Sequence, residues 1–270
     1  MLLLTPVLSA VAEEEMGKNN VEVILITDEE LDALSSSDAA FVSEPYVPET
    51  IEKTIIGADN RVTISNPWEY PYSAIAYLVF SMECGCDGTA SGFMVSANTM
   101  MTAAHCMVCA EHNKPVNSLT AYFGYRSNKN YGYKFTGGYT VWHNEGFYNG
   151  THSSNHNWDY AYLRLNERVG DRTGWFGLSS PSDSQLDMTV VEVAGYRNGV
   201  LKTDWDYAHV YNDYQFTYEN DTEPGNSGCP VFDSDYYVLG INVAGGTRDN
   251  TARRITSDLI NRMRSNGLFD

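Results

Sequence analysis

The chain has 270 residues, long enough for one large domain or for two barrel-sized halves with a sizeable core. Charged residues make up 19% and hydrophobic residues 43% of it, as in an ordinary globular protein, while 19 tyrosines and 22 glycines favour a β-rich one. The net charge of -18 argues against binding to nucleic acid or to an anionic membrane, both of which require basic patches, so we expect a soluble, acidic protein. We also expect a monomer.

The first twelve residues, "MLLLTPVLSAVA", form an uncharged apolar run that is too short to span a bilayer. The run closes on Ala10-Val11-Ala12, a small-x-small pattern that signal peptidases accept. It lacks the positively charged start of a full signal peptide. We therefore predict a truncated signal peptide at 1–12 and a secreted protein, with an ordinary apolar N-terminus as the alternative.

Residues 13–53 form a distinct acidic segment. They hold 12 acidic residues and 2 lysines, whereas residues 54–270 hold 23 acidic and 15 basic residues. The segment ends in "SEPYVPETIEK", where Pro45 and Pro48 favour an extended, linker-like chain. We predict a propeptide at 13–53, and the alternative is a disordered acidic leader.

From residue 54 onward the pattern alternates with a period of two. Short stretches rich in β-branched and aromatic residues are separated by Gly, Asn, Asp or Ser, and they predict antiparallel strands in a sandwich or barrel. These stretches are 73–80, 91–97, 159–165, 189–196, 209–218 and 236–246.

The end of the chain has a helical period instead. Ile255, Leu259 and Met263 recur every four residues in "ITSDLINRMRSNG". Thr256 or Ser257 can cap the start of this helix, and Gly267 can end it. We therefore predict an all-β domain with one C-terminal α-helix.

Three separated segments supply the parts of a nucleophilic hydrolase. His105 ends the apolar run of "MMTAAHC", Asp159 opens the strand of "DYAYLRL", and Ser227 lies between glycines in "EPGNSGCPVF". A serine hydroxyl becomes a good nucleophile when an imidazole takes its proton, and the imidazole needs a carboxylate to fix its tautomer. Gly225 allows a turn in which its own amide and that of Ser227 could bind a developing oxyanion.

These motifs carry a family resemblance. "TAAHC", "DYAYLRL" and "GNSGCPVF" resemble the three triad segments of chymotrypsin-fold serine proteases, and "TIIGADNRVTISNPWEYPYSAIAYLV" from Thr54 resembles the mature start of bacterial glutamyl endopeptidases. The resemblance covers 54 to about 260 and implies two antiparallel six-stranded β-barrels, with the triad in the cleft between them. It implies a protease domain at 54–270 that acts on proteins or peptides, needs no cofactor and binds no metal.

The resemblance also implies how the enzyme matures. It places the mature N-terminus near Thr54, which requires cleavage after Lys53 and is typical of a zymogen. Cleavage after a lysine favours a separate activating protease, although Glu52 leaves self-cleavage with trimming open.

The residues that would read the substrate depart from the family. In its members a histidine after the nucleophile, a hydroxyl five residues before it and the terminal amine bind the glutamate carboxylate. Here Thr222 supplies the hydroxyl and Thr54 the amine, but Asn242 replaces the histidine. An amide carries no positive charge, so we predict a weakened preference for Glu. Asp221 makes Lys or Arg specificity the alternative.

The cysteines leave two kinds of chemistry open. Cys84-x-Cys86 and Cys106-x-x-Cys109, with His105 and His112 beside them, have spacing that zinc sites use. The secretory context and the resemblance favour two disulfides between these pairs, although Ala90 stands where the family has the usual partner. Cys229 is then a single thiol, expected to lie buried beside the nucleophile turn.

A non-catalytic binding protein of the same fold is the alternative from another functional class. Such relatives usually lose one member of the triad, so the intact triad favours the enzyme. The remaining histidines have no catalytic context and are expected at the surface or in packing: His112, His143, His152, His156 and His209.

Overall fold

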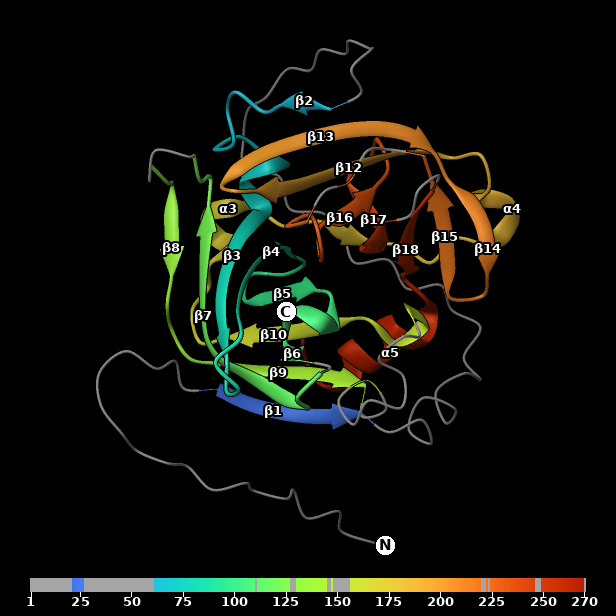
Figure 1. The fold of residues 1–270 in the computed structure, drawn as a ribbon. Helices are drawn as coiled ribbons and strands as arrows, with labels where there is room; N and C mark the ends of the chain where they lie inside the picture. Colours follow the sequence, from blue (N-terminus) through green and yellow to red (C-terminus); the bar gives the residue numbers. More distant parts are fainter. Residues whose placement is uncertain are drawn as a thin grey trace, which may run out of the picture.

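The structure is a computed structural model, and it describes residues 21–26, 61–109, 111–126, 130–144, 147, 156–219, 222, 224–245 and 249–269. Two curled β-sheets dominate this part of the chain (Figure 1). The predicted signal peptide, most of the predicted propeptide and the predicted mature N-terminus lie outside the described residues. Among the helices described, none is long and apolar enough to cross a membrane.

The first sheet has nine strands, six of which correspond to the predicted barrel. These six are β3 (Ile75–Met82), β4 (Asp87–Met94), β5 (Thr99–Thr102), β7 (Lys114–Phe123), β9 (Tyr139–Asn144) and β10 (Ala161–Leu165). The other three are β1 (Val21–Ile26), β6 (Val108–Cys109) and β8 (Tyr133–Phe135).

The second sheet repeats this plan with nine strands of its own. Its six main strands are β12 (Val190–Arg197), β13 (Val200–Tyr207), β15 (Gln215–Tyr218), β16 (Pro230–Phe232), β17 (Tyr237–Gly245) and β18 (Asn250–Arg254). It also holds β2 (Val62–Thr63), β11 (Gly177–Leu178) and β14 (His209–Asn212). The two-barrel, mostly antiparallel fold is confirmed, but each half has three extra strands, and the pairs β1–β9 and β11–β17 are parallel.

Alternating burial explains why these segments form strands. In β7 the side chains of Leu119, Ala121 and Phe123 are buried, while those of Thr120 and Tyr122 between them are half-buried. Side chains on a strand point alternately to its two faces, so one face of β7 builds the core and the other lies nearer the solvent.

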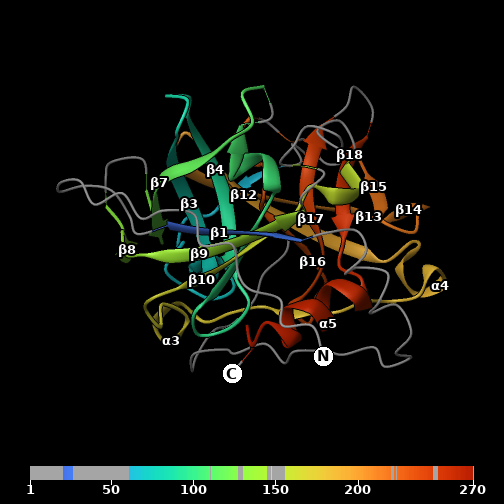
Figure 2. The ribbon, with the colours of Figure 1, turned by 90° about the horizontal axis from the view of Figure 1, so that it is seen from below.

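The two halves pack against each other through aromatic side chains and the C-terminal helix. The rings of Tyr77 on β3 and Tyr196 on β12 lie 5.5 Å apart, and the hydroxyl of Tyr196 accepts a hydrogen bond from the amide of Tyr125. Figure 2 shows the two sheets side by side. Their junction is where the sequence-distant parts of a catalytic site can meet.

The helix α5 (Ser257–Ser265) follows β18 and ties the second half to the first. Thr256 caps it, since its side chain accepts from the amide of Leu259, and Gly267 follows it with a φ of 64°. Both caps were predicted. Beyond the helix, the carbonyl of Leu268 accepts from the hydroxyls of Ser96 and Thr99 in the first half.

Shorter helices complete the fold. They are the 3-10 helices η1 (Tyr72–Ala74), η2 (Ala104–Cys106) and η3 (His156–Trp158), and the one-turn helices α3 (Gly170–Thr173) and α4 (Asp183–Leu186).

Strand β1 was not predicted. It lies within the acidic segment 13–53 and pairs in parallel with the whole of β9, from Val21 opposite Tyr139 to Ile26 opposite Asn144. It also lies near β7, at the other end of the sheet. Part of the acidic segment is therefore a sheet strand, which does not fit a wholly disordered leader.

Candidate active site

Strand pairing brings His105 and Asp159 together. His105 is the middle residue of η2, which follows β5, and Asp159 lies between η3 and β10. Strands β5 and β10 are antiparallel neighbours with Thr102 opposite Ala161. The residues that follow β5 therefore lie beside the residues that precede β10. The side chains of His105 and Asp159 meet at this end of the sheet.

The carboxylate of Asp159 holds His105 at two points. Its Oδ2 lies 2.7 Å from Nδ1 of the imidazole, and its Oδ1 accepts from the backbone amide of His105 at 3.0 Å. The Asp159 side chain is 3% exposed, whereas that of His105 is 33% exposed. The imidazole is thus fixed on the carboxylate side and open to solvent on another.

The two groups shift each other's pKa values in opposite directions. Burial alone would lower the pKa of His105, but the negative charge of Asp159 and the hydrogen bond to it raise this pKa well above 6.5. Burial alone would raise the pKa of Asp159, but the charge and hydrogen bonds of His105 lower it below its usual value. The pair therefore favours a carboxylate beside a readily protonated imidazole.

Ser227 lies in a turn that two glycines make possible. Gly225 has a φ of 109° and Gly228 a φ of 80°, conformations that residues with a Cβ rarely adopt. The hydroxyl of Ser91 on β4 donates to the carbonyl of Gly225 at 3.0 Å and accepts from the amide of Tyr196. The amide of Ser91 in turn donates to the carbonyl of Ser227 at 2.8 Å.

This turn contacts the residues that lead into His105. A Cβ on Gly228 would lie 2.1 Å from the hydroxyl of Thr102 and 2.9 Å from the amide nitrogen of Ala103. Only glycine allows so close an approach. The segments of Ser227 and His105, which come from opposite halves of the chain, therefore meet at the junction of the two sheets.

The amides expected to bind an oxyanion lie in the same turn. The amide of Gly228 donates to the carbonyl of Asn242, and that of Cys229 to the carbonyl of Asn226. Among the hydrogen bonds of the described residues, those two amides are occupied, and the amides of Gly225 and Ser227 remain available as donors.

The structure places two of the four residues expected to read the substrate. The Thr222 hydroxyl donates to Oδ1 of Asn250 at 2.5 Å. Asn242 is buried, accepts from the hydroxyl of Tyr218 at 2.6 Å and donates to the carbonyl of Asn226 at 3.2 Å. Both polar ends of its amide are therefore engaged by the protein. Asp221 and Thr54 lie outside the described residues.

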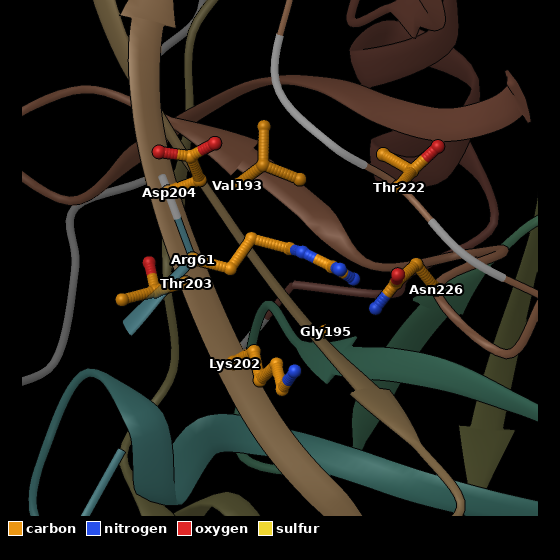
Figure 3. Close-up of a pocket in the computed structure, with 8 residues that line it drawn as sticks. All are labelled: Arg61, Val193, Gly195, Lys202, Thr203, Asp204, Thr222 and Asn226. Carbon is orange, nitrogen blue, oxygen red and sulfur yellow. The ribbon is translucent and has the colours of Figure 1, made fainter. Parts of the chain in front are cut away.

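A pocket borders this region (Figure 3). The side chain of Arg61 points across it toward Asn226, and the ammonium of Lys202 lies nearby, so two cations face the segment before Ser227. Among the described residues that line the pocket, Asp204 is the acidic one. The pocket is lined by Arg61, Val193, Gly195, Lys202, Thr203, Asp204, Thr222 and Asn226.

The disulfide prediction does not hold in the structure. All five cysteines of the chain lie in its described part, and all are free thiols. Cys106 lies in η2 and is 1% exposed, with its side chain in the core, whereas Cys109 lies on β6 beside Cys86. The 3-10 turn therefore places Cys106 in the core, and of the two cysteines expected to bridge to Cys84 and Cys86, Cys109 is the one that lies beside them. Cys229 is buried as expected, and burial raises the pKa of its thiol.

Two residues near Asp159 were not singled out from the sequence. His156, expected at the surface or in packing, lies with Nδ1 4.0 Å from Oδ2 of Asp159. Arg253, 2% exposed, donates from Nε to the carbonyl of Asn157 at 2.6 Å and lies over the ring of Tyr160. The position of His156, three residues before Asp159, could have indicated that its side chain lies near the carboxylate. Nothing in the sequence linked Arg253 to this loop.

A fixed His–Asp pair that meets a glycine-bounded serine turn between two β-barrels defines a serine endopeptidase of the chymotrypsin fold. The family model described as Trypsin matches residues 55–260, and the chain belongs to this family. It is 30% identical to the "Extracellular metalloprotease" of Bacillus subtilis (strain 168), over 77% of this chain and 68% of that protein. It is 28% identical to the "Glutamyl endopeptidase" of Bacillus licheniformis, over 78% of this chain and 68% of that protein.

Solved structures have the same fold. A Glu endopeptidase in complex with MPD superimposes with a TM-score of 0.67 at 19% identity, over 80% of this chain and all of that one. The thermostable serine protease AL20 superimposes with a TM-score of 0.58 at 16% identity, over 73% of this chain and 98% of that one.

Proposed function

We propose that this serine endopeptidase is secreted and cleaves peptide bonds through an acyl-enzyme. Ser227 attacks the carbonyl carbon, His105 accepts the proton of the Ser227 hydroxyl, and Asp159 orients the imidazole. The 2.7 Å contact between Asp159 and His105 carries this assignment, because a buried carboxylate on Nδ1 leaves Nε2 as the base.

The reaction has two halves that use the same imidazole. In the first, the Ser227 oxygen bonds to carbon while the C–N bond breaks, and protonated His105 gives its proton to the leaving amine. In the second, His105 takes a proton from water as the water oxygen bonds to the ester carbon, and it then returns this proton to the Ser227 oxygen as the ester C–O bond breaks and the carboxylic acid product leaves. The amides of Gly225 and Ser227 would stabilise the oxyanion of each tetrahedral intermediate.

A covalent probe tests the nucleophile. A fluorophosphonate should label the enzyme, and Ser227→Ala should abolish labelling and peptide hydrolysis together. Ser184→Ala, which changes an exposed serine on α4, is the matched control and should keep both. Labelling that survives Ser227→Ala would show that the nucleophile is misassigned, and no labelling of the activated parent would favour the non-catalytic binding protein.

The acidic segment 13–53 is best explained as a propeptide of a zymogen. Its charge sets it apart from the protease domain, and its strand β1 pairs along β9, so it is attached to the sheet it would leave. A separate protease that cleaves near Lys53 would activate the enzyme. N-terminal sequencing of secreted, active material is the test, and a first residue outside 53–57 would discard this maturation site.

For the cleaved bond we propose a weakened preference for Glu. Asn242 carries no charge and its amide is engaged by Tyr218 and Asn226, so it cannot replace a histidine that binds a carboxylate. The cations Arg61 and Lys202 at the pocket beside Thr222 supply positive potential instead. Charge-assisted hydrogen bonds are stronger than neutral ones, so we expect the loss of the histidine charge to cost roughly 10-fold to 100-fold in discrimination for Glu, with uncharged polar residues also accepted.

Peptide-library profiling of the activated enzyme tests this preference. Asn242→His should raise the rate on Glu substrates, and Arg61→Gln should lower it, while Arg168→Gln at an exposed site should change neither. Cleavage almost only after Lys or Arg would instead support the alternative in which Asp221 sets the specificity.

Metal-dependent hydrolysis is a second candidate, because the Bacillus subtilis relative is named a metalloprotease. A catalytic metal needs an open coordination position near a general base. If a chelator abolished hydrolysis while fluorophosphonate labelling of Ser227 stayed complete, the serine mechanism would be wrong for this chain.

A further inference from the structure

A second cluster of reactive side chains lies on the first sheet, apart from the triad. It joins Cys84, Cys86, Cys109 and His112, whose sulfur and nitrogen atoms all lie within 4.8 Å of one another. The three cysteines are half-buried and the histidine is exposed. None of these residues belongs to the proposed triad or lines the pocket beside Thr222.

Two neighbouring hairpins bring the four side chains together. Cys84 and Cys86 flank Gly85 in the turn between β3 and β4, where Gly85 has a φ of 83° and the amide of Met82 donates to the carbonyl of Cys86. Cys109 ends β6, and His112 lies in the turn between β6 and β7.

The backbone joins these two hairpins directly. The amide of Glu83 donates to the carbonyl of Pro115 at 2.9 Å, and β3 pairs with β7 beside it, Met82 opposite Val116. Neither hairpin can shift without the other, so the backbone of the sheet preorganises the four side chains.

The spacing of the donor atoms fits a tetrahedral metal site. Around a zinc ion with Zn–S near 2.3 Å and Zn–N near 2.0–2.1 Å, sulfur atoms lie about 3.8 Å apart, and a sulfur and a nitrogen about 3.6 Å apart. The sulfurs of Cys86 and Cys109 are 3.9 Å apart, and Nδ1 of His112 lies 3.7 Å from the first and 3.3 Å from the second.

A disulfide explains the same cluster less well. The sulfur atoms of a disulfide lie about 2.05 Å apart, and three thiols can form only one such bond. A disulfide between Cys86 and Cys109 would leave Cys84 and His112 beside it without a role. All four residues contribute to a tetrahedral set of three sulfurs and one nitrogen.

From this geometry we propose that the chain binds one structural zinc ion through Cys84, Cys86, Cys109 and the Nδ1 of His112. Three thiolates and one imidazole are a donor set that proteins use for zinc, and they fill all four positions, which leaves none for a substrate or catalytic water. Binding displaces the protons of the three thiols to solvent, and the complex carries a net charge of -1. This proposal departs from the expectation, implied by the family resemblance, that the chain binds no metal.

The place of this site suggests what the zinc does. Cys109 follows His105 by four residues, and the amide of Val116 on β7 donates to the carbonyl of Met107 between them. A zinc ion that holds Cys109 to the β3–β4 turn would anchor the segment that leaves η2. The proposal does not depend on the catalytic mechanism, since such a site would stabilise the first sheet of an inactive relative equally well.

Metal analysis of the full-length chain tests the site. The purified protein should carry about one zinc per chain, and Cys84→Ser, Cys109→Ser and His112→Ala should each weaken zinc binding by more than about tenfold, because even the loss of an outer-shell partner has effects of that size. Cys106→Ala and His209→Ala are the controls, since the buried thiol and the exposed histidine lie outside the cluster. Both should keep full zinc.

A readout independent of activity identifies the ligands. Cobalt(II) bound in place of zinc should give the thiolate charge-transfer band and the intense visible bands of a tetrahedral site. His112→Ala changes an exposed side chain, so it should fold with unchanged circular dichroism while its cobalt spectrum changes. Protein that takes up no zinc or cobalt when metal is supplied would overturn the proposal. A Cys86–Cys109 disulfide, found as two cysteines that resist alkylation in denaturant and chelator until reductant is added, would overturn it as well.

Discussion

The guanidinium of Arg253, on β18 of the second sheet, holds the loop that carries Asp159 of the first. Its Nε donates at 2.6 Å to the carbonyl of Asn157, two residues before the carboxylate that binds His105. A residue from the end of the chain thus positions a candidate catalytic group encoded almost a hundred residues earlier.

Arg253→Met should therefore impair catalysis and stability together. The change removes a part-buried, charge-assisted hydrogen bond and leaves the Asn157 carbonyl without this donor, at a cost of about 1.5–3 kcal/mol in the free energy of unfolding. We expect kcat to fall more than KM rises, because the substituted residue contacts the loop and not the substrate. Urea unfolding and steady-state kinetics measure both effects. Arg168→Met, at a half-exposed surface ion pair, should change neither by much.

The pH dependence of activity should report the shifted pKa of His105. The imidazole acts as a base only when neutral, and Asp159 raises its pKa well above 6.5, so activity should be lost on acidification at a pH above the value usual for histidine. Asp159→Asn should move this acid limb to lower pH and reduce kcat by about 10⁴-fold. A pH profile of kcat/KM for the two proteins is the measurement, and an acid limb below 6.5 in the parent would contradict the assignment.

The same pair gives stability a defined pH window. The lowered pKa of Asp159 stabilises the fold above the usual carboxyl pKa of 3.8, and this contribution is lost as the pH falls through the folded value. The raised pKa of His105 stabilises the fold at low pH and is lost as the pH rises through its folded value. Asp159→Asn should therefore destabilise the protein most between these limits, as thermal unfolding across pH would show.

Gly228→Ala should inactivate the enzyme. Its Cβ would meet Thr102 and Ala103 at 2.1 and 2.9 Å and push the Ser227 turn away from His105. Gly267→Ala is the control, since Gly267 also has a positive φ but its Cβ would meet only the end of the Arg164 side chain, at 3.3 Å. We expect the control to lose about 1 kcal/mol in the free energy of unfolding with activity unchanged. Equal losses in the two variants would show that backbone strain alone explains the effect.

Ser91→Ala should separate turn geometry from general stability. The hydroxyl of Ser91 links the carbonyl of Gly225 to the amide of Tyr196, so its loss frees the turn that would bind the oxyanion. We expect kcat to fall by roughly 10-fold to 100-fold, since oxyanion donors contribute mainly in the transition state. Ser73→Ala removes another buried, hydrogen-bonded hydroxyl, which donates to the carbonyl of Thr173, and should lower stability with kcat unchanged.

A sequence pattern can predict a candidate site residue when that residue lies next to a strand whose neighbours follow from the order of the strands. His105, Asp159 and Ser227 each adjoin a strand, and strand order then brings two of them to one end of a sheet. The cysteines show the opposite case. Cys106 and Cys109 look like a pair in the sequence, but the 3-10 turn directs Cys106 into the core. His112 lies near Cys84, Cys86 and Cys109 because of the hairpin between β6 and β7, and the sequence alone does not fix the register of that hairpin.

Side-chain direction was also beyond the sequence. Asn242 occupies the expected position, but whether its amide faces a substrate or the protein depends on Tyr218 and on the carbonyl of Asn226, which come from other segments. Arg253 is comparable, since its role depends on contacts with a loop from the other half of the fold.

Strand β1 has a consequence for how the enzyme would behave after maturation. An open strand edge exposes a row of backbone donors and acceptors that can pair with another chain, and β1 covers that row along all six residues of β9. Cleavage near Lys53 would cut the covalent link to this strand without breaking its ladder of hydrogen bonds. If the freed peptide stays, the active enzyme consists of two chains, and if it dissociates, β9 becomes an adhesive edge through which enzyme molecules can aggregate.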